Sequence, residues 1–197
     1  RWPLVVIALA LTTPASVAFS EVQMSNEALQ QLGSFESHSL LKADETFKDK
    51  KWKQAFSEYN SFVLEFPRSS AIPYALLRKA RCLHLQGKRF EAIKHYTEVL
   101  DFFPNQVPYA APALYHIGQC HWQNGDVDKA MAAFARMADD VDYSRHPLAA
   151  SAINQLADQL AKQGKAERAA FYHRQVSVDF RRRNAGAARD SMRHVIG

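Results

Sequence analysis

Apolar residues recur at helical spacing in eight segments of the chain, and short polar joints separate these segments. Within a segment the apolar positions fall three and four residues apart, which places them on one face of an α-helix. The pattern predicts helices at residues 38–48, 52–65, 73–86, 90–102, 111–123, 127–139, 148–163 and 166–180, with a last partial helix after Gly186. Residues 19–37 lack a strong apolar period, so we interpret them as a leader or a weak capping helix.

The predicted helices form pairs, and the pairs form a repeat that aligns on four alanines. These are Ala55, Ala92, Ala130 and Ala169, which gives periods of 37, 38 and 39 residues. Four further positions recur in register with the alanines: a small residue twelve before (Ala43, Ala80, Gly118, Ala157), mostly glycine five before (Lys50, Gly87, Gly125, Gly164), a ring four after (Tyr59, Tyr96, Phe134, His173), and proline twelve after in the first two copies (Pro67, Pro104, then Asp142 and Arg181).

Each recurrent position has a physical role in a pair of packed helices. A small residue lets the second helix cross close to the first, and glycine takes the left-handed conformation that ends the first helix. A large ring fills the space between the helices, and proline stops the second helix. Glycine numbers only seven and threonine only four, so residues for a hairpin-rich fold are scarce. We therefore predict an all-α fold.

This set of residues at these offsets resembles the tetratricopeptide repeat over about residues 36–181. The resemblance implies a right-handed solenoid of about four helix-turn-helix repeats with a C-terminal capping helix. The period is longer than the usual one of about 34 residues. Phrases such as Phe66-Pro67-Arg68 and residues 103–118 are similar to the long-period repeats of periplasmic proteins, including bacterial cell-division coordinator proteins and outer-membrane assembly lipoproteins.

The two ends of the chain differ from the repeats in composition. Arg1, an apolar run at residues 4–11 and small residues at 16–18 are typical of a secretory signal peptide that is cleaved after Ala18. Since the run is too short to span a bilayer, we expect no transmembrane segment in the mature chain and a periplasmic or secreted location. The net charge of +5 is concentrated near the C-terminus. The predicted organisation is a signal peptide (1–18), a leader or capping segment (19–37), four repeats (38–181) and a basic cap (182–197).

No set of residues converges on a catalytic or metal site. His116 and Cys120 are four residues apart on one helical face, but zinc needs three or four ligands. We interpret Cys82 and Cys120 as small core residues, because they occupy equivalent places in neighbouring repeats. Asp126 follows Gly125 and is interpreted as the N-cap of its helix. The sequence carries no phosphate loop, dinucleotide fingerprint or hydrolase signature. We predict no enzyme activity, no catalytic residue, no metal ligand and no cofactor.

The candidate binding residues lie on the first helix of each repeat, which lines a concave groove in tetratricopeptide proteins. The stripe that would face this groove holds Leu77, Arg81, His84, Tyr115, Gln119, Trp122, Asn154 and Asp158. A neighbouring stripe that begins with Leu76, Ala80 and Leu83 already supplies the core. Tyr115 and Trp122 are therefore extra aromatic residues on a face that need not be buried, where such rings act as binding anchors. The alternative is that both rings pack under the next repeat.

These features favour a non-enzymatic protein-interaction scaffold of the cell envelope. It would bind a segment of a partner protein, itself envelope-associated, in the concave groove. The alternative function is binding of an anionic polymer, either glycan or nucleic acid, through Arg181, Arg182 and Arg183. A solvated cap on the last repeat explains the same arginines. We do not expect nucleic acid as the partner.

Overall fold

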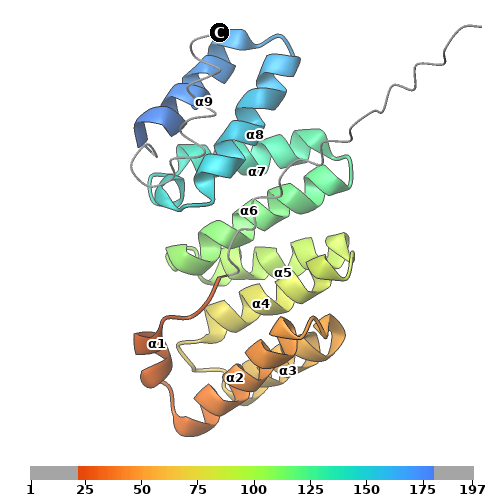
Figure 1. Ribbon diagram of the computed structural model, residues 1–197, viewed down its shortest axis with the longest axis vertical. Coiled ribbons are helices and arrows are strands. Elements are labelled where there is room, and N and C mark those ends of the chain that lie inside the picture. Colours follow the sequence, from red (N-terminus) through yellow and green to blue (C-terminus); the bar gives the residue numbers. More distant parts are fainter. Residues whose placement is uncertain (1–21, 180–197) are drawn as a thin grey trace, which may run out of the picture.

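Within the described residues, 22–179 of this computed structural model, every regular element is a helix (Figure 1). The helices are α1 (Asn26–Gln30), α2 (Ser34–Lys48), α3 (Trp52–Glu65), α4 (Ile72–Leu85), α5 (Arg89–Phe102), α6 (Val107–Gln123), α7 (Val127–Asp139), the 3₁₀-helix η1 (Tyr143–Arg145), α8 (Ala149–Lys162) and α9 (Ala166–Asp179). The prediction of an all-α fold is confirmed.

The helices are arranged as a stack of pairs. Each helix from α2 to α9 packs on the next one in the chain, and the first helices of neighbouring pairs also touch, α4 with α6 and α6 with α8. Figure 1 shows the pairs one above another, from α2 and α3 at one end to α8 and α9 at the other. This is the predicted helical repeat solenoid. The partial helix predicted after Gly186 lies outside the described residues.

Two helices begin four residues earlier than the apolar pattern predicts. The α2 helix begins at Ser34, where the Gly33 N–H donates to Glu36 Oε2 at 3.0 Å and so caps the first turn. The apolar pattern does not detect this turn, because its residues are polar except for Phe35, which is exposed. The α6 helix begins at Val107 and carries Pro108 in its first turn. Proline is tolerated there because that turn's N–H groups have no intrahelical acceptor.

The turn inside each repeat has one backbone geometry in all four copies. Its fifth position before the anchor alanine has positive φ: 61° at Lys50, 78° at Gly87, 82° at Gly125 and 76° at Gly164. The next N–H then bonds back into the first helix, from Lys88 to the Leu83 carbonyl at 3.0 Å and likewise in the other copies. Such bonds satisfy the last carbonyls of a helix. The predicted glycine cap is confirmed, and Lys50 adopts it without being glycine.

The repeat positions form the core between the helices. The anchors Ala55, Ala92 and Ala130 are fully buried, as are the rings of Tyr59, Tyr96 and Phe134. The tightest crossing is at Gly118, where a Cβ atom would lie only 2.3 Å from Phe134 Cε1. Cys82 and Cys120 are also fully buried, which confirms their assignment to the core.

The side chain of Asp126 does not cap its helix. The residue stands at the N-cap position of α7, but its backbone has ψ of 63° and its side chain forms no capping hydrogen bond. An N-cap residue normally needs an extended backbone to aim its oxygen at the first turn. The Asp126 carboxylate lies instead 3.3 Å from His121 Nδ1. Asp126 is therefore the N-cap residue, as the sequence predicted, but its side chain does not supply the capping hydrogen bond.

The crossing of α6 and α7 yields a prediction about stability. Gly118→Ala should lower the free energy of unfolding by about 1 to 3 kcal/mol, because the methyl group overlaps the Phe134 ring. Urea denaturation of the variant measures this. In a Phe134→Leu background the same glycine substitution should cost less, because the ring edge that it meets is gone. Equal costs in both backgrounds would show that the two residues are not coupled.

The positive φ of Lys50 yields a second prediction. Lys50→Gly should raise the free energy of unfolding by about 0.5 to 1 kcal/mol, since glycine adopts this conformation without the Cβ clash. The matched substitution Gly87→Lys places a side chain on the equivalent turn of the next repeat and should destabilise by a similar amount. Both values come from urea denaturation. A loss of stability in Lys50→Gly would mean that the lysine side chain contributes more than its backbone costs.

Candidate functional site

The face formed by the first helices α2, α4, α6 and α8 carries the predicted groove stripe, and part of that stripe is buried. Leu77, His84 and Tyr115 are only 2%, 7% and 6% exposed. Tyr115 lies against Phe134 with ring centroids 6.2 Å apart. The expectation that Tyr115 stands on an open face is wrong, because its ring is buried against α7 where α6 also packs on α4 and α8. Trp122 remains half-buried and packs on the core by one side.

Polar residues of the stripe connect α4 to α6, α6 to α8, and α8 to its own partner helix α9. His84 on α4 lies 3.3 Å from Arg81 and 3.3 Å from Gln123 of α6. Gln119 of α6 donates to Gln155 of α8 at 3.0 Å, and Asp158 of α8 lies 3.5 Å from His173 of α9. The stripe therefore aligns neighbouring first helices as well as facing outward.

Several stripe residues still present part of their surface. Arg81, Gln119, Trp122, Asn154 and Asp158 are all partly exposed. They combine one aromatic ring, two amides and one charge of each sign. A partner segment laid along the face would meet both hydrogen-bonding groups and an apolar ring.

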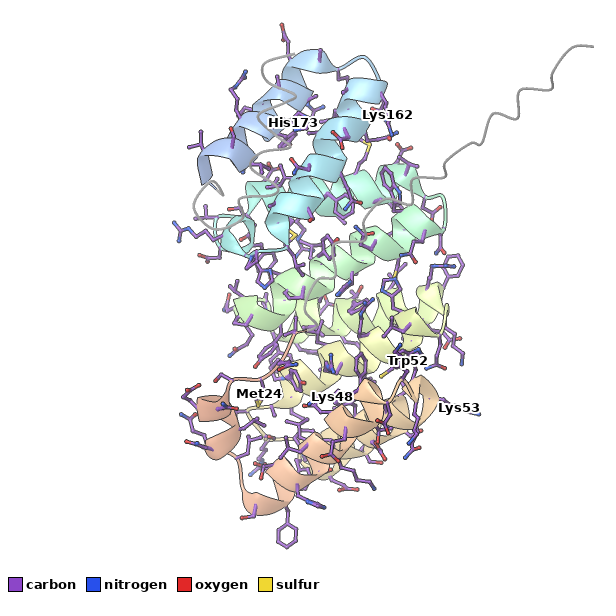
Figure 2. All side chains as sticks on the ribbon, viewed as in Figure 1. Met24, Lys48, Trp52, Lys53, Lys162 and His173 are labelled. Carbon is purple, nitrogen blue, oxygen red and sulfur yellow. The ribbon has the colours of Figure 1, made fainter. Side chains whose placement is uncertain are left out.

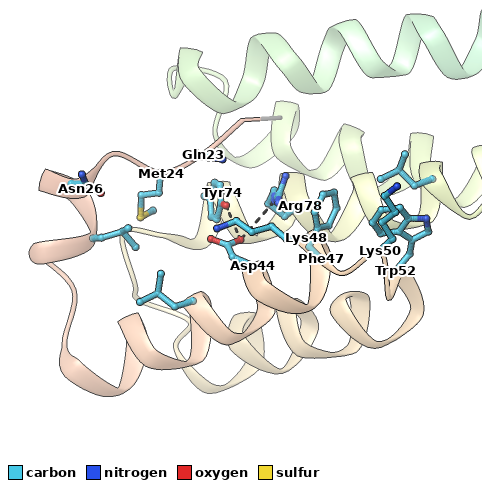
Figure 3. A pocket seen from close by; sticks show the side chains of 13 residues that line it. Gln23, Met24, Asn26, Asp44, Phe47, Lys48, Lys50, Trp52, Tyr74 and Arg78 are labelled. Atoms are coloured by element: carbon cyan, nitrogen blue, oxygen red, sulfur yellow. Dashed lines mark hydrogen bonds and ion pairs between the residues drawn. The ribbon is translucent and has the colours of Figure 1, made fainter. Parts of the chain in front are cut away.

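A pocket opens at the N-terminal end of the same face, between the segment before α1, helix α2 and the end of α4 (Figure 3). Its volume is about 490 Å³. The side chains that line it include apolar ones (Met24, Leu29, Leu41, Phe47, Trp52, Leu85), charged ones (Asp44, Lys48, Lys50, Arg78) and Tyr74. Apolar walls with a few polar groups are typical of ligand pockets of about 300 to 1,000 Å³.

A buried polar network forms the floor of this pocket. The Asp44 carboxylate accepts hydrogen bonds from the Tyr59 hydroxyl and, at 2.7 Å, from the Tyr74 hydroxyl. Arg78 Nε donates to the Tyr59 hydroxyl at 3.2 Å and lies 3.8 Å from Asp44. The Arg78 guanidinium also stacks over the Phe47 ring, 3.6 Å from its centroid. These contacts join α2 and α3 of the first repeat to α4 of the second.

The pKa values in the network follow from this burial. Burial raises the pKa of the Tyr59 and Tyr74 hydroxyls, so both stay protonated and donate to Asp44. Burial works against the Arg78 charge, but Tyr74, Tyr59 and Asp44 outweigh it and raise the pKa of Arg78. The floor therefore holds one carboxylate and one guanidinium whose charges offset each other.

Two lysines, Lys48 and Lys50, line the pocket near the turn between α2 and α3. Figure 2 shows Lys48, Trp52 and Lys53 together at the first repeat, far from Lys162 and His173 in the last. Trp52 packs on Phe47 with ring centroids 5.2 Å apart. The sequence interpretation missed Lys48 and Trp52 as site residues. The sequence feature that could have identified them is the run of residues 48–53. It holds four lysines and a tryptophan, where the other repeats have a glycine turn.

The described residues show little that could support catalysis. Burial raises the pKa of the Cys120 thiol to about 12, which disfavours the nucleophilic thiolate. Burial together with the Arg81 charge lowers the pKa of His116 well below its usual value. Residues 22–179 contain no group of three or more His, Cys, Asp or Glu that could hold a metal ion, and none of their helices is long and apolar enough to cross a membrane. Arg181, Arg182 and Arg183 lie outside the described residues.

Solved structures with a similar fold share little sequence with this chain. BtubC (BKLC) from P. vanneervenii is 14% identical, with a TM-score of 0.58 and coverage of 78% of this chain and 67% of its own. A putative kinesin light chain with nearly identical TPR-like repeats from P. anserina is 14% identical, with a TM-score of 0.56 and coverage of 80% and 82%. MamA is 13% identical, with a TM-score of 0.55 and coverage of 83% and 89%. At these identities the likeness concerns the fold.

The sequence itself gives the family. No curated protein sequence matches the chain. A family model does match it, over residues 30–185, and this model is described as the SusR N-terminal TPR domain. The matched range contains all four helix pairs of the stack. The chain therefore belongs to the family of the SusR N-terminal TPR domain, a family of tetratricopeptide repeat domains.

Proposed function

We propose that the protein is a non-enzymatic scaffold of the cell envelope that binds a segment of a partner protein on the face of α2, α4, α6 and α8. The observation that carries the proposal is that these first helices contact one another in order, α2 with α4 through Asp44 and Tyr74, then α4 with α6 and α6 with α8, with partly exposed polar and aromatic side chains along them. Solenoid proteins use such extended surfaces for binding. Tetratricopeptide repeats generally mediate protein–protein interaction, and proteins built from them are generally non-catalytic.

The chemistry of the face suits a polypeptide. Gln119 and Gln155 bond to each other, yet each amide has further donors and acceptors that can reach a main chain. Trp122 is half-buried, so it is held by the core on one side and offers ring surface on the other. A tryptophan held in this way is a typical anchor of a protein interface.

The envelope location rests on the N-terminal sequence. We infer that residues 1–18 are a signal peptide, that a leader follows and precedes the repeats, whose first helix begins at Ser34, and that 182–197 form a basic cap. The likeness to long-period periplasmic repeat proteins supports the same location. An exported scaffold would meet its partner, an envelope-associated protein, on the outer side of the cytoplasmic membrane.

The signal peptide can be tested by mass spectrometry. When the full chain is expressed in a bacterial host, the mature protein should begin at Phe19 and fractionate with the periplasm. Ala18→Arg should block cleavage, because the peptidase requires a small residue at this position. An unprocessed cytoplasmic chain in both cases would contradict the envelope location.

The binding face can be tested by site-specific photocrosslinking. A p-benzoylphenylalanine in place of Trp122 should crosslink to a partner protein in an envelope extract. The matched control places it at Phe102, which is 72% exposed on the second helix α5 and lies off the face. Both changes replace one aromatic side chain with another, so the folds should remain comparable. Equal crosslinking from both positions would contradict the assigned face.

Salt dependence and a triple arginine substitution distinguish the proposed function from the alternative one. Binding of an anionic polymer through Arg181, Arg182 and Arg183 would weaken steeply with salt and would be lost when these residues become Gln. Binding on the helix face should survive that triple substitution. Capture that depends on the arginines and not on the Trp122 region would favour the polymer.

A further inference from the structure

We propose that the pocket between the N-terminal segment, α2 and the end of α4 binds an acidic peptide, with one large apolar side chain inside and a neighbouring carboxylate on Lys48 and Lys50. This inference deepens the proposed function, because it names the class of segment that the face receives and the end of the face where that segment is anchored.

The net positive charge of the pocket favours an anionic ligand. On its floor, Asp44 is engaged by two tyrosine hydroxyls and by Arg78, so the carboxylate and the guanidinium offset each other. The side chains of Lys48 and Lys50 also line the pocket, and in the described part of the chain neither ammonium group forms an ion pair or a hydrogen bond. Two positive charges therefore face the pocket without a matching carboxylate. Figure 3 shows Lys48 extended along the pocket in front of Asp44.

The apolar walls of the pocket favour a ligand with an apolar side chain. Phe47 and Trp52 lie in ring contact on one side, and Leu41, which is 46% exposed on α2, stands on another. Leu29 and Leu85 complete the apolar lining from α1 and α4. Apolar surface left open in a concave site is stabilised when a partner covers it. An occupant with only charged groups would leave these walls in contact with water.

The chain's own N-terminal segment indicates that the occupant is an extended peptide. This segment reaches Ser25 in an extended conformation, with φ of −67° and ψ of 153°. It inserts Met24, which is only 8% exposed, while Gln23 before it is exposed. An extended chain with alternating side chains thus already packs on this face and forms one wall of the pocket. A partner peptide would lie beside it in the same manner.

The neighbouring lysines provide a matched control for a test. Lys51 and Lys53 flank Trp52 in the sequence and do not line this pocket. The pair Lys48→Gln with Lys50→Gln and the pair Lys51→Gln with Lys53→Gln remove the same charge within six residues of sequence. Lys50→Gly adds a variant that removes a pocket lysine while relieving the positive φ, so weaker binding in it is not caused by a weaker fold.

The experiment selects binders from a phage library of random dodecapeptides on the full chain and measures one selected synthetic peptide by fluorescence anisotropy. The selected sequences should place Asp or Glu within two residues of Phe, Trp, Leu or Met. The pocket pair of lysine substitutions should weaken binding about tenfold and Lys50→Gly about threefold. The control pair should change it less than about twofold, and Leu41→Ala should weaken binding with a smaller salt dependence.

Three results would overturn the proposal. Selected peptides without an acidic preference, equal weakening by the two lysine pairs, or no selected peptide at all would each exclude the pocket as an acidic-peptide site. The proposed function is judged separately by the crosslink at Trp122. If that crosslink to a partner is seen while the pocket variants bind normally, the face binds a protein but the pocket does not anchor it.

Discussion

The close crossing of the two helices within each repeat is the constraint on which the rest of the structure depends. At α6 and α7 this crossing brings Phe134 so near Gly118 that not even a Cβ atom fits between them. The other pairs use alanine at the equivalent place, and all of these alanines are fully buried. Since dispersion contacts fall off steeply with distance, helices held this near each other bury their anchors completely. The positive-φ turn between the two helices ends the first helix and reverses the chain, so that the second helix packs back against the first.

A single pair cannot bury both of its sides, so each pair depends on its neighbours. Between first helices, the contact is partly polar: His84 reaches Gln123, and Gln119 reaches Gln155. Such bonds have directions and so fix how one repeat is rotated on the next, which apolar packing leaves less defined. The side chains that align the stack are thus the same ones that border the candidate binding face.

The first repeat departs from the others, and the departure creates the pocket. In the described residues, α2 is preceded by the short helix α1 and the extended segment before it, whose buried Met24 lines the pocket. The network of Asp44, Tyr59, Tyr74 and Arg78 holds α2 and α3 of the first repeat against α4 of the second. Lys50 replaces the glycine of the other turns and accepts an unfavourable backbone conformation. Because Lys50 has an unfavourable backbone conformation in the first repeat, we expect its side chain to have a role in binding, and the proposed acidic peptide would bind to it.

The sequence by itself determined the all-α class, the repeat register, the left-handed caps and the core alanines and rings. These follow from local rules: apolar spacing sets a helix face, and only a few residue types fit a tight crossing or a positive φ. Tertiary structure alone decided the exposure of the stripe. Tyr115 on α6 is covered because Phe134 of α7 packs against it and α8 packs on the same helix. The spacing of residues along one helix does not determine the distance between helices. The pocket is a tertiary feature for the same reason. Met24, Lys48 and Arg78 come from three segments, and only the packing of those segments brings them around one cavity.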